Sequence, residues 1–123
     1  MRIFATKAFA RFARHEDISS GELCEAIERA EAGLIAADLG GGIIKQRIAR
    51  KGQGKSGGLR TIVIFRLQTR AVFVYGYAKS TRSDIGPDEL KAFRRLAAEL
   101  LSLDTAGIAA AMKNGTLQEI KKS

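Results

Sequence analysis

The sequence predicts an α+β fold in which two N-terminal helices and further C-terminal helices pack on a small antiparallel sheet of three or more strands. Two observations support this fold class. Apolar residues recur at helical spacing toward both ends of the chain, whereas the middle holds short runs of β-branched and aromatic residues between glycine-rich or polar breaks. The 123 residues are enough for one compact core, so we expect a single domain spanning residues 1–123.

Two helices are predicted in the first third of the chain. Thr6–Arg14 is expected as a short helix because its two phenylalanines share one side, and the "MRIF" before it could be extended. Ser19 with Glu22 three residues later is typical of a capping box that starts the second helix. The "DLGGG" segment at 38–42 breaks the helical pattern and is predicted to be a loop. The buried stripe of the second helix is predicted to comprise Leu23, Ile27, Ala30 and Leu34.

Three strands are predicted in the middle, at 42–49, 59–66 and 71–78, and they should form an antiparallel meander. A long loop, residues 50–58, joins the first two strands, and "LQTR" fits a hairpin turn before the third. In the second strand the alternation of side chains defines two opposite faces: Leu59, Thr61, Val63 and Phe65 on one, and Arg60, Ile62, Ile64 and Arg66 on the other.

The C-terminal part is predicted to contain two more helices. Pro87 suits a first helical turn, and the acidic residues after it complement the helix dipole. Asp104 and Thr105 cap a fourth helix that Gly115 stops, and the tail "TLQEIKKS" is either a short strand or disordered. The buried stripe of the third helix is expected to comprise Leu90, Phe93, Leu96, Ala97, Leu100 and Leu101.

The net charge of +8 is concentrated in one segment. Residues 1–38 carry five lysines and arginines against seven acids, and residues 84–123 carry six of each. Residues 39–83 hold ten cations and no carboxylate: Lys45, Arg47, Arg50, Lys51, Lys55, Arg60, Arg66, Arg70, Lys79 and Arg82. A surface suited only to solubility mixes its signs, so this segregation indicates a binding face for a polyanion.

Nucleotide and metal sites are not supported by the sequence. "ARKGQGKS" approaches the phosphate-binding loop G-x-x-x-x-G-K-[ST], but Ala49 replaces the first glycine and a predicted strand follows where the motif requires a helix. No acidic residue that could hold magnesium follows before Asp84. His15 and Cys24 lie on different predicted helices without ligand spacing, so we predict no metal site and no cofactor.

The segment 50–60, "RKGQGKSGGLR", is suited to an RNA phosphate backbone, because glycines let the chain approach while closely spaced cations bind phosphates. Arg60 opens a strand, so it is a fixed arginine that could stabilise the charge of a reacting phosphodiester. Crowded cations lower the pKa of a lysine, so Lys51, Lys55 or Lys79 could take a proton from a ribose 2′-hydroxyl. The alternative is that the cations only dock to a polyanion.

Two longer stretches, "RIARKGQGKSGGLRTIVIFR" and "AVFVYGYAKSTRSDI", resemble the RelE/HigB-like toxins of bacterial type II toxin–antitoxin systems, particularly the HigB-like branch. The likeness extends from "FATKAFARFARHEDIS" to "GTLQEI" and so covers nearly the whole chain. It implies a small α+β toxin with a central antiparallel sheet that enters the ribosomal A site and cleaves messenger RNA there. It also implies a cognate antitoxin that neutralises the toxin by occupying its basic surface.

The resemblance assigns roles to residues of this chain. The family's strand-borne arginine after a glycine pair falls on Arg60, its loop cations fall on Lys51 and Lys55, and its later basic motif falls on Lys79 and Arg82. The predicted catalytic residues are Arg60, Lys55, Lys51, Lys79, Arg82 and Tyr77. The predicted nucleic-acid-binding residues are Lys45, Arg47, Arg50, Lys51, Lys55, Arg60, Lys79 and Arg82.

The chain departs from the RelE-type pattern at two positions. Ser80 stands where RelE-type toxins carry an arginine, and Gly86 stands where they place a tyrosine used in proton transfer. Tyr77, just before the basic motif, could substitute for that tyrosine, although a strand tyrosine is more often packing.

Two other functions remain open from the sequence. Members of the wider superfamily related to ParE poison DNA gyrase and cleave no RNA, so the chain could be a non-nucleolytic gyrase inhibitor. A plain basic nucleic-acid-binding module is the third possibility. One cysteine and no apolar run near the roughly 20 residues of a membrane span indicate a cytoplasmic protein. Its expected partners are a cognate antitoxin and the ribosome with messenger RNA, without a membrane or small-molecule cofactor.

Overall fold

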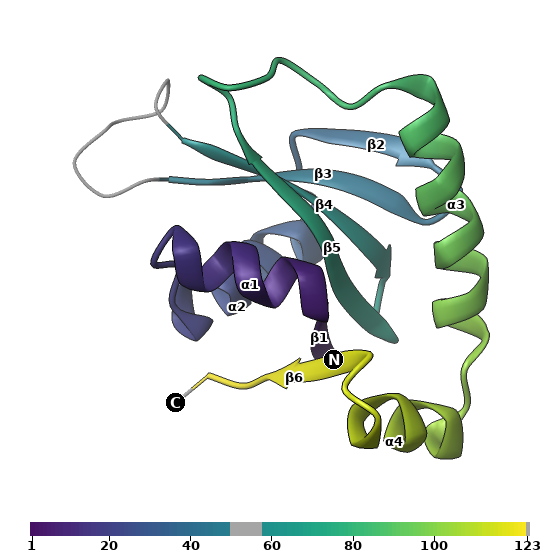
Figure 1. Cartoon of the computed structure of the whole chain (residues 1–123). Coiled ribbons are helices and arrows are strands. Elements are labelled where there is room, and N and C mark those ends of the chain that lie inside the picture. Colours follow the sequence, from purple (N-terminus) through teal and green to yellow (C-terminus); the bar gives the residue numbers. More distant parts are fainter. Residues whose placement is uncertain (50–57, 123) are drawn as a thin grey trace.

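The computed structural model describes residues 1–49 and 58–122, which form a six-stranded sheet with helices on both faces (Figure 1). In chain order the elements of these residues are β1 (Arg2–Thr6), α1 (Lys7–His15), α2 (Ser20–Glu31), β2 (Ala37–Gly40), β3 (Ile43–Ile48), β4 (Leu59–Arg66), β5 (Arg70–Ala78), α3 (Pro87–Ser102), α4 (Thr105–Lys113) and β6 (Leu117–Ile120). The predicted α+β class is confirmed.

The strand order is β2-β3-β4-β5-β1-β6. The predicted meander is confirmed as β3, β4 and β5, which pair antiparallel. The "MRIF" segment and the C-terminal tail add two further strands, since β1 pairs parallel with β5 and β6 pairs antiparallel with β1. The sheet is therefore mostly, and not wholly, antiparallel, and both ends of the chain meet at one edge of it (Figure 1).

Each face of the sheet has its own core. Helices α1 and α2 cover one face, where Phe9 and Ile27 pack with Val63 and Phe73, and α3 covers the other (Figure 1). On the α3 face the core comprises Phe4, Ile43, Ile62, Ile64, Val72, Val74, Ala97, Leu100, Ile108, Ala111 and Leu117. The predicted alternation of the second strand is thus confirmed, because Val63 and Ile62 lie in different cores.

Helices α2 and α4 begin at the predicted caps. Ser19 Oγ accepts a hydrogen bond from the Glu22 amide at 3.1 Å, and Glu22 Oε1 accepts one from the Ser19 amide at 3.1 Å. Asp104 Oδ1 accepts from the Gly107 amide at 2.8 Å and starts α4. These bonds satisfy amides that a helix leaves without an internal partner.

Two predictions are wrong in the region after α2. The 38–42 segment is not all loop, because Ala37–Gly40 forms the edge strand β2 and pairs with β3. Leu34 does not belong to the buried stripe, because α2 ends at Glu31 and Gly33, with φ of 82°, turns the chain away. The Leu34 side chain is consequently 63% exposed.

Within residues 1–49 and 58–122, no helix is both long and apolar enough to cross a membrane. Among the predicted site residues, Arg50, Lys51 and Lys55 lie outside the part of the chain that the structure describes.

Candidate active site on the α3 face of the sheet

Three predicted site residues form a row across neighbouring strands. Arg47 on β3 pairs with Arg60 on β4, and Arg60 pairs with Tyr77 on β5. Directly paired residues on one face have Cβ atoms about 4.5–5.5 Å apart, so the side chains of Arg47 and Tyr77 start on either side of that of Arg60. Both also act electrostatically on Arg60, whose pKa is lowered by burial and then by the charge of Arg47, while Tyr77 raises it. We call Arg47, Arg60 and Tyr77 the paired row. It lies on the α3 face, near the end of β3 and the start of β4, the two strand ends that residues 50–57 connect in sequence.

A β-bulge in β5 gives Tyr77 this orientation. Ile62 pairs with Tyr75 whereas Val63 pairs with Phe73, so Val74 is an extra residue opposite β4. Strict alternation from Phe73, which lies in the α1 and α2 core, would turn Tyr75 toward that same core. The extra residue instead brings Tyr75 and Tyr77 to the α3 face, as bulges commonly re-aim side chains beside functional sites.

Gly76 between the two tyrosines lies against the opposite layer. A Cβ atom at this position would come within 2.3 Å of Phe12 Cε2 on α1. Because real Cβ atoms do not approach so closely, only glycine fits under the Phe12 ring without a shift. The packing of α1 thus helps to fix the part of β5 that carries both tyrosines.

Arg60 and Tyr77 are buried, with exposed fractions of 7% and 4%. Among the described residues, neither Arg60 Nη1 nor Tyr77 Oη has a hydrogen-bond partner. Burial lowers the pKa of Arg60, and the charge of Arg47 lowers it further, while burial raises the pKa of Tyr77. Buried polar groups are nearly always hydrogen-bonded, so two such groups side by side are a ready site for an anionic oxygen.

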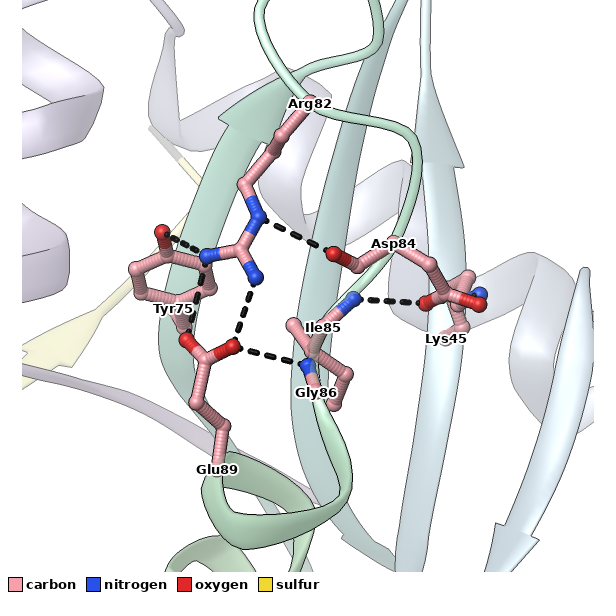
Figure 2. Close-up of polar contacts among 7 residues, drawn as sticks. All are labelled: Lys45, Tyr75, Arg82, Asp84, Ile85, Gly86 and Glu89. Atoms are coloured by element: carbon pink, nitrogen blue, oxygen red, sulfur yellow. Dashed lines mark hydrogen bonds and ion pairs between the residues drawn. The ribbon is translucent and has the colours of Figure 1, made fainter.

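Arg82 has the opposite environment (Figure 2). Its Nη2 and Nη1 atoms bind the two carboxylate oxygens of Glu89 at 2.6 and 3.0 Å. Nη1 also donates to the Tyr75 hydroxyl at 2.9 Å, and Nε donates to the carbonyl oxygen of Asp84 at 3.0 Å. The carboxylate of Glu89 balances the charge of Arg82. Their ion pair lowers the pKa of Glu89 to about 2 and raises the pKa of Arg82. We call Arg82, Glu89 and Tyr75 the Arg82 clasp.

Lys45 is also paired. Its Nζ binds Asp84 Oδ1 at 2.8 Å, and the same oxygen accepts a hydrogen bond from the Ile85 amide at 2.8 Å (Figure 2). The bond from Lys45 lowers the pKa of the Asp84 carboxyl. Lys79 is exposed in the turn after β5 and lies outside the paired row.

Sequence reasoning missed these carboxylates and the bulge. Asp84 and Glu89 immediately follow the carboxylate-free segment, and the fold returns them to cations inside it. The available signal for the second pair was the separation of only 7 residues between Arg82 and Glu89. Asp84 and Lys45 are 39 residues apart, so the sequence offered no such signal for the first pair. No cluster of three or more His, Cys, Asp or Glu side chains within the described ranges could hold a metal ion.

Comparison with known proteins agrees with the fold and with the sequence motifs. A family model described as the RelE toxin of the RelE/RelB toxin–antitoxin system matches residues 1–120. A search among curated proteins found no match.

Proposed function

The chain belongs to the RelE toxin family, and we propose that this toxin of a toxin–antitoxin system is an endoribonuclease that cleaves messenger RNA on the ribosome. The observation that carries the proposal is the pairing of Arg60 with Tyr77, two buried groups whose polar atoms have no hydrogen-bond partner among the described residues. A phosphate oxygen placed between them would satisfy both, and water would be excluded by the surrounding strands.

The proposed reaction needs no external nucleophile. The ribose 2′-oxygen attacks the adjacent phosphorus, the bond from phosphorus to the 5′-oxygen breaks, and the products are a 2′,3′-cyclic phosphate and a 5′-hydroxyl. Arg60 would stabilise the added negative charge of the phosphorane, because its backbone is fixed in β4 and its side chain is already buried beside Tyr77 before the reaction starts.

Tyr77 would give its proton to the departing 5′-oxygen. A phenol has an ordinary pKa of about 10 and therefore carries its proton at neutral pH, which suits an acid and not a base. Burial raises the pKa of Tyr77 further. Lys51, Lys55 or Lys79 would take the proton from the 2′-hydroxyl. Of these three lysines, the described residues include Lys79, which is exposed. This assignment gives the chain an acid despite Gly86 at the position of the family's tyrosine.

Binding of the messenger would extend beyond the reacting phosphate. Arg47 is exposed and lies opposite Arg60. Within the described residues it forms no salt bridge with a carboxylate, so it is suited to bind the phosphate next to the reacting one. The remaining proposed RNA contacts are Lys45, Arg50, Lys51, Lys55 and Lys79. Arg82, which the sequence also assigned to RNA binding, is instead held by Glu89. The cognate antitoxin would cover this same basic face, and the toxin would act on ribosomes in the cytoplasm.

Cleavage of a messenger on purified ribosomes tests the proposal. Arg60→Gln should lower the single-turnover cleavage rate about 10²–10³-fold, the usual effect of losing one preorganised donor. Tyr77→Phe should lower it about 10²–10⁴-fold through loss of the acid. Arg66→Gln is the matched control, because Arg66 is an exposed arginine on the same face of the same strand. Wild-type rates in both site variants, or no cleavage by the wild type, would contradict the proposal.

A further inference from the structure

Arg60 and Arg82 were assigned the same chemistry from the sequence, but the structure gives them different surroundings. Resting on the proposed function, we infer that Arg82 is a positioning residue: held by Glu89, it fixes Tyr75 and Tyr77 beside Arg60 and does not bind a substrate phosphate.

The first argument is the use of the Arg82 donors. A guanidinium has five N–H groups, and four hydrogen bonds already run from Arg82 to Glu89, Tyr75 and Asp84. The pair with Glu89 is bidentate, the geometry in which arginine and carboxylate bind most strongly. A phosphate would have to displace this carboxylate from Arg82, whereas at Arg60 Nη1 it would displace no carboxylate found among the described residues.

The second argument is the contact between Arg82 and the two tyrosine rings. The Arg82 Cζ atom lies 5.7 Å from the centre of the Tyr75 ring and 5.6 Å from that of the Tyr77 ring. The two rings lie 5.9 Å apart, and Tyr75 also packs on Phe93 of α3 at 5.8 Å. The guanidinium therefore lies over both tyrosine rings of β5. Glu89 connects it to the first turn of α3 (Figure 2).

The third argument is that Glu89 is itself anchored. Its Oε1 atom accepts a hydrogen bond from the Gly86 amide at 2.8 Å, in addition to that from Arg82. Gly86 precedes Pro87, the first residue of α3. Glu89 thereby connects the start of the helix, the segment after β5 and the tyrosine pair, so a shift of the Arg82 clasp would move Tyr77 relative to Arg60.

A charge-neutral double variant separates positioning from phosphate binding. Arg82→Gln with Glu89→Gln removes the ion pair and leaves the net charge unchanged. The matched control is Arg2→Gln with Glu119→Gln, a second bidentate pair with distances of 2.9 and 3.1 Å between β1 and β6. The first readout is the salt dependence of binding to a single-stranded 2′-O-methyl RNA oligonucleotide, which cannot be cleaved by 2′-hydroxyl attack.

We expect the double variant to keep the wild-type slope of log K against log salt, whereas Arg60→Gln should reduce its magnitude by about 0.7, the value of one phosphate contact on a single strand. The two clasp single variants are Arg82→Gln and Glu89→Gln. In the cleavage assay, both single variants and the double variant should show the same fall in kcat, with KM unchanged. The expected fall is about 10²-fold, the effect of a small misplacement of a reacting group. A loss of about 0.7 in the slope of the double variant would make Arg82 a phosphate ligand and overturn the inference. A faster reaction with Glu89→Gln alone would also overturn the inference, because it would show that Arg82 acts on the substrate once it is released from Glu89.

Tyrosine fluorescence provides a readout that does not require catalysis. The chain has two tyrosines and no tryptophan, and both tyrosines contact Arg82, so the intrinsic emission reports on this cluster. Both clasp single variants should change the emission equally, and the Arg2 and Glu119 control should leave it unchanged. Unchanged emission in all clasp variants would refute the positioning role. If the wild type cleaves no RNA, the proposed function fails, while the emission and the salt slope still decide the role of Arg82.

Discussion

Replacing Arg60 by methionine should make the folded protein more stable while lowering the cleavage rate about 10²–10³-fold. Arg60 is 7% exposed, its Nη1 atom has no hydrogen-bond partner among the described residues, and it lies directly opposite Arg47. A buried charge with an unsatisfied donor and a like-charged neighbour across the strands is a cost to folding. Arg60→Met keeps a long side chain for the space between the strands and removes the charge and the donor.

The size of the effect follows from the buried donor. An unsatisfied buried polar group costs about 1–3 kcal/mol, so the free energy of unfolding should rise by about 1–3 kcal/mol in Arg60→Met. The midpoint of thermal unfolding should rise by about 4 °C for each kcal/mol in a protein of this size. Higher stability and slower cleavage are expected together in this variant. The charge of Arg60 is unfavourable in the free protein and is useful only when an anion is bound.

Urea unfolding of purified wild type and Arg60→Met, followed by circular dichroism, measures the difference. Arg66→Met is the control, because Arg66 is exposed on the same strand and its replacement should change the unfolding free energy by less than about 0.5 kcal/mol. A variant less stable than the wild type would show that Arg60 makes favourable contacts in the free protein. The description of the paired row as a preformed anion site would then be wrong.

Two further changes test the surroundings of the site. Gly76→Ala should destabilise the fold by about 1–3 kcal/mol, because the added Cβ overlaps the Phe12 ring, and urea unfolding should show it. Gly21→Ala, whose Cβ would lie 3.8 Å from its nearest neighbour in α2, should instead stabilise by about 0.4–1 kcal/mol, and equal effects of the two would refute the packing argument. In acid titrations, Glu89→Gln should flatten the loss of stability below about pH 4.5. The pKa of Glu89 falls from its ordinary value of 4.5 to about 2 on folding, so its contribution is complete above the ordinary value and is lost as the pH falls through about 2. An unchanged acid profile would contradict the strength of the pair with Arg82.

Local signals made most of the fold predictable. Ser19 and Glu22 cap α2, and Asp104 caps α4, as the sequence pattern indicates. The alternation in strand 59–66 correctly separates the two cores. The edge strand β2 was not predictable in the same way, because its stability comes from pairing with β3 and its glycines carry a turn signal.

The site was predictable in its residue types and not in their environments. Arg60 was expected to be fixed by a strand, and β4 holds it as expected. The bulge at Val74 depends on the register between two strands and has no local signature, so the orientation of Tyr77 was hidden. The pairing of Arg82 with Glu89 was hidden for a similar reason, because counting charges along a segment ignores carboxylates that the next helix brings back.

The most direct test of the central claim is to map and identify the ends of messenger RNA after brief induction of the toxin, wild type beside Arg60→Gln. We predict new cuts within translated frames for the wild type alone, with a 2′,3′-cyclic phosphate upstream and a 5′-hydroxyl downstream of each cut. Growth arrest without new ends would contradict the claim and indicate a non-nucleolytic target such as DNA gyrase. The same cuts with Arg60→Gln would show that the paired row does not carry the reaction.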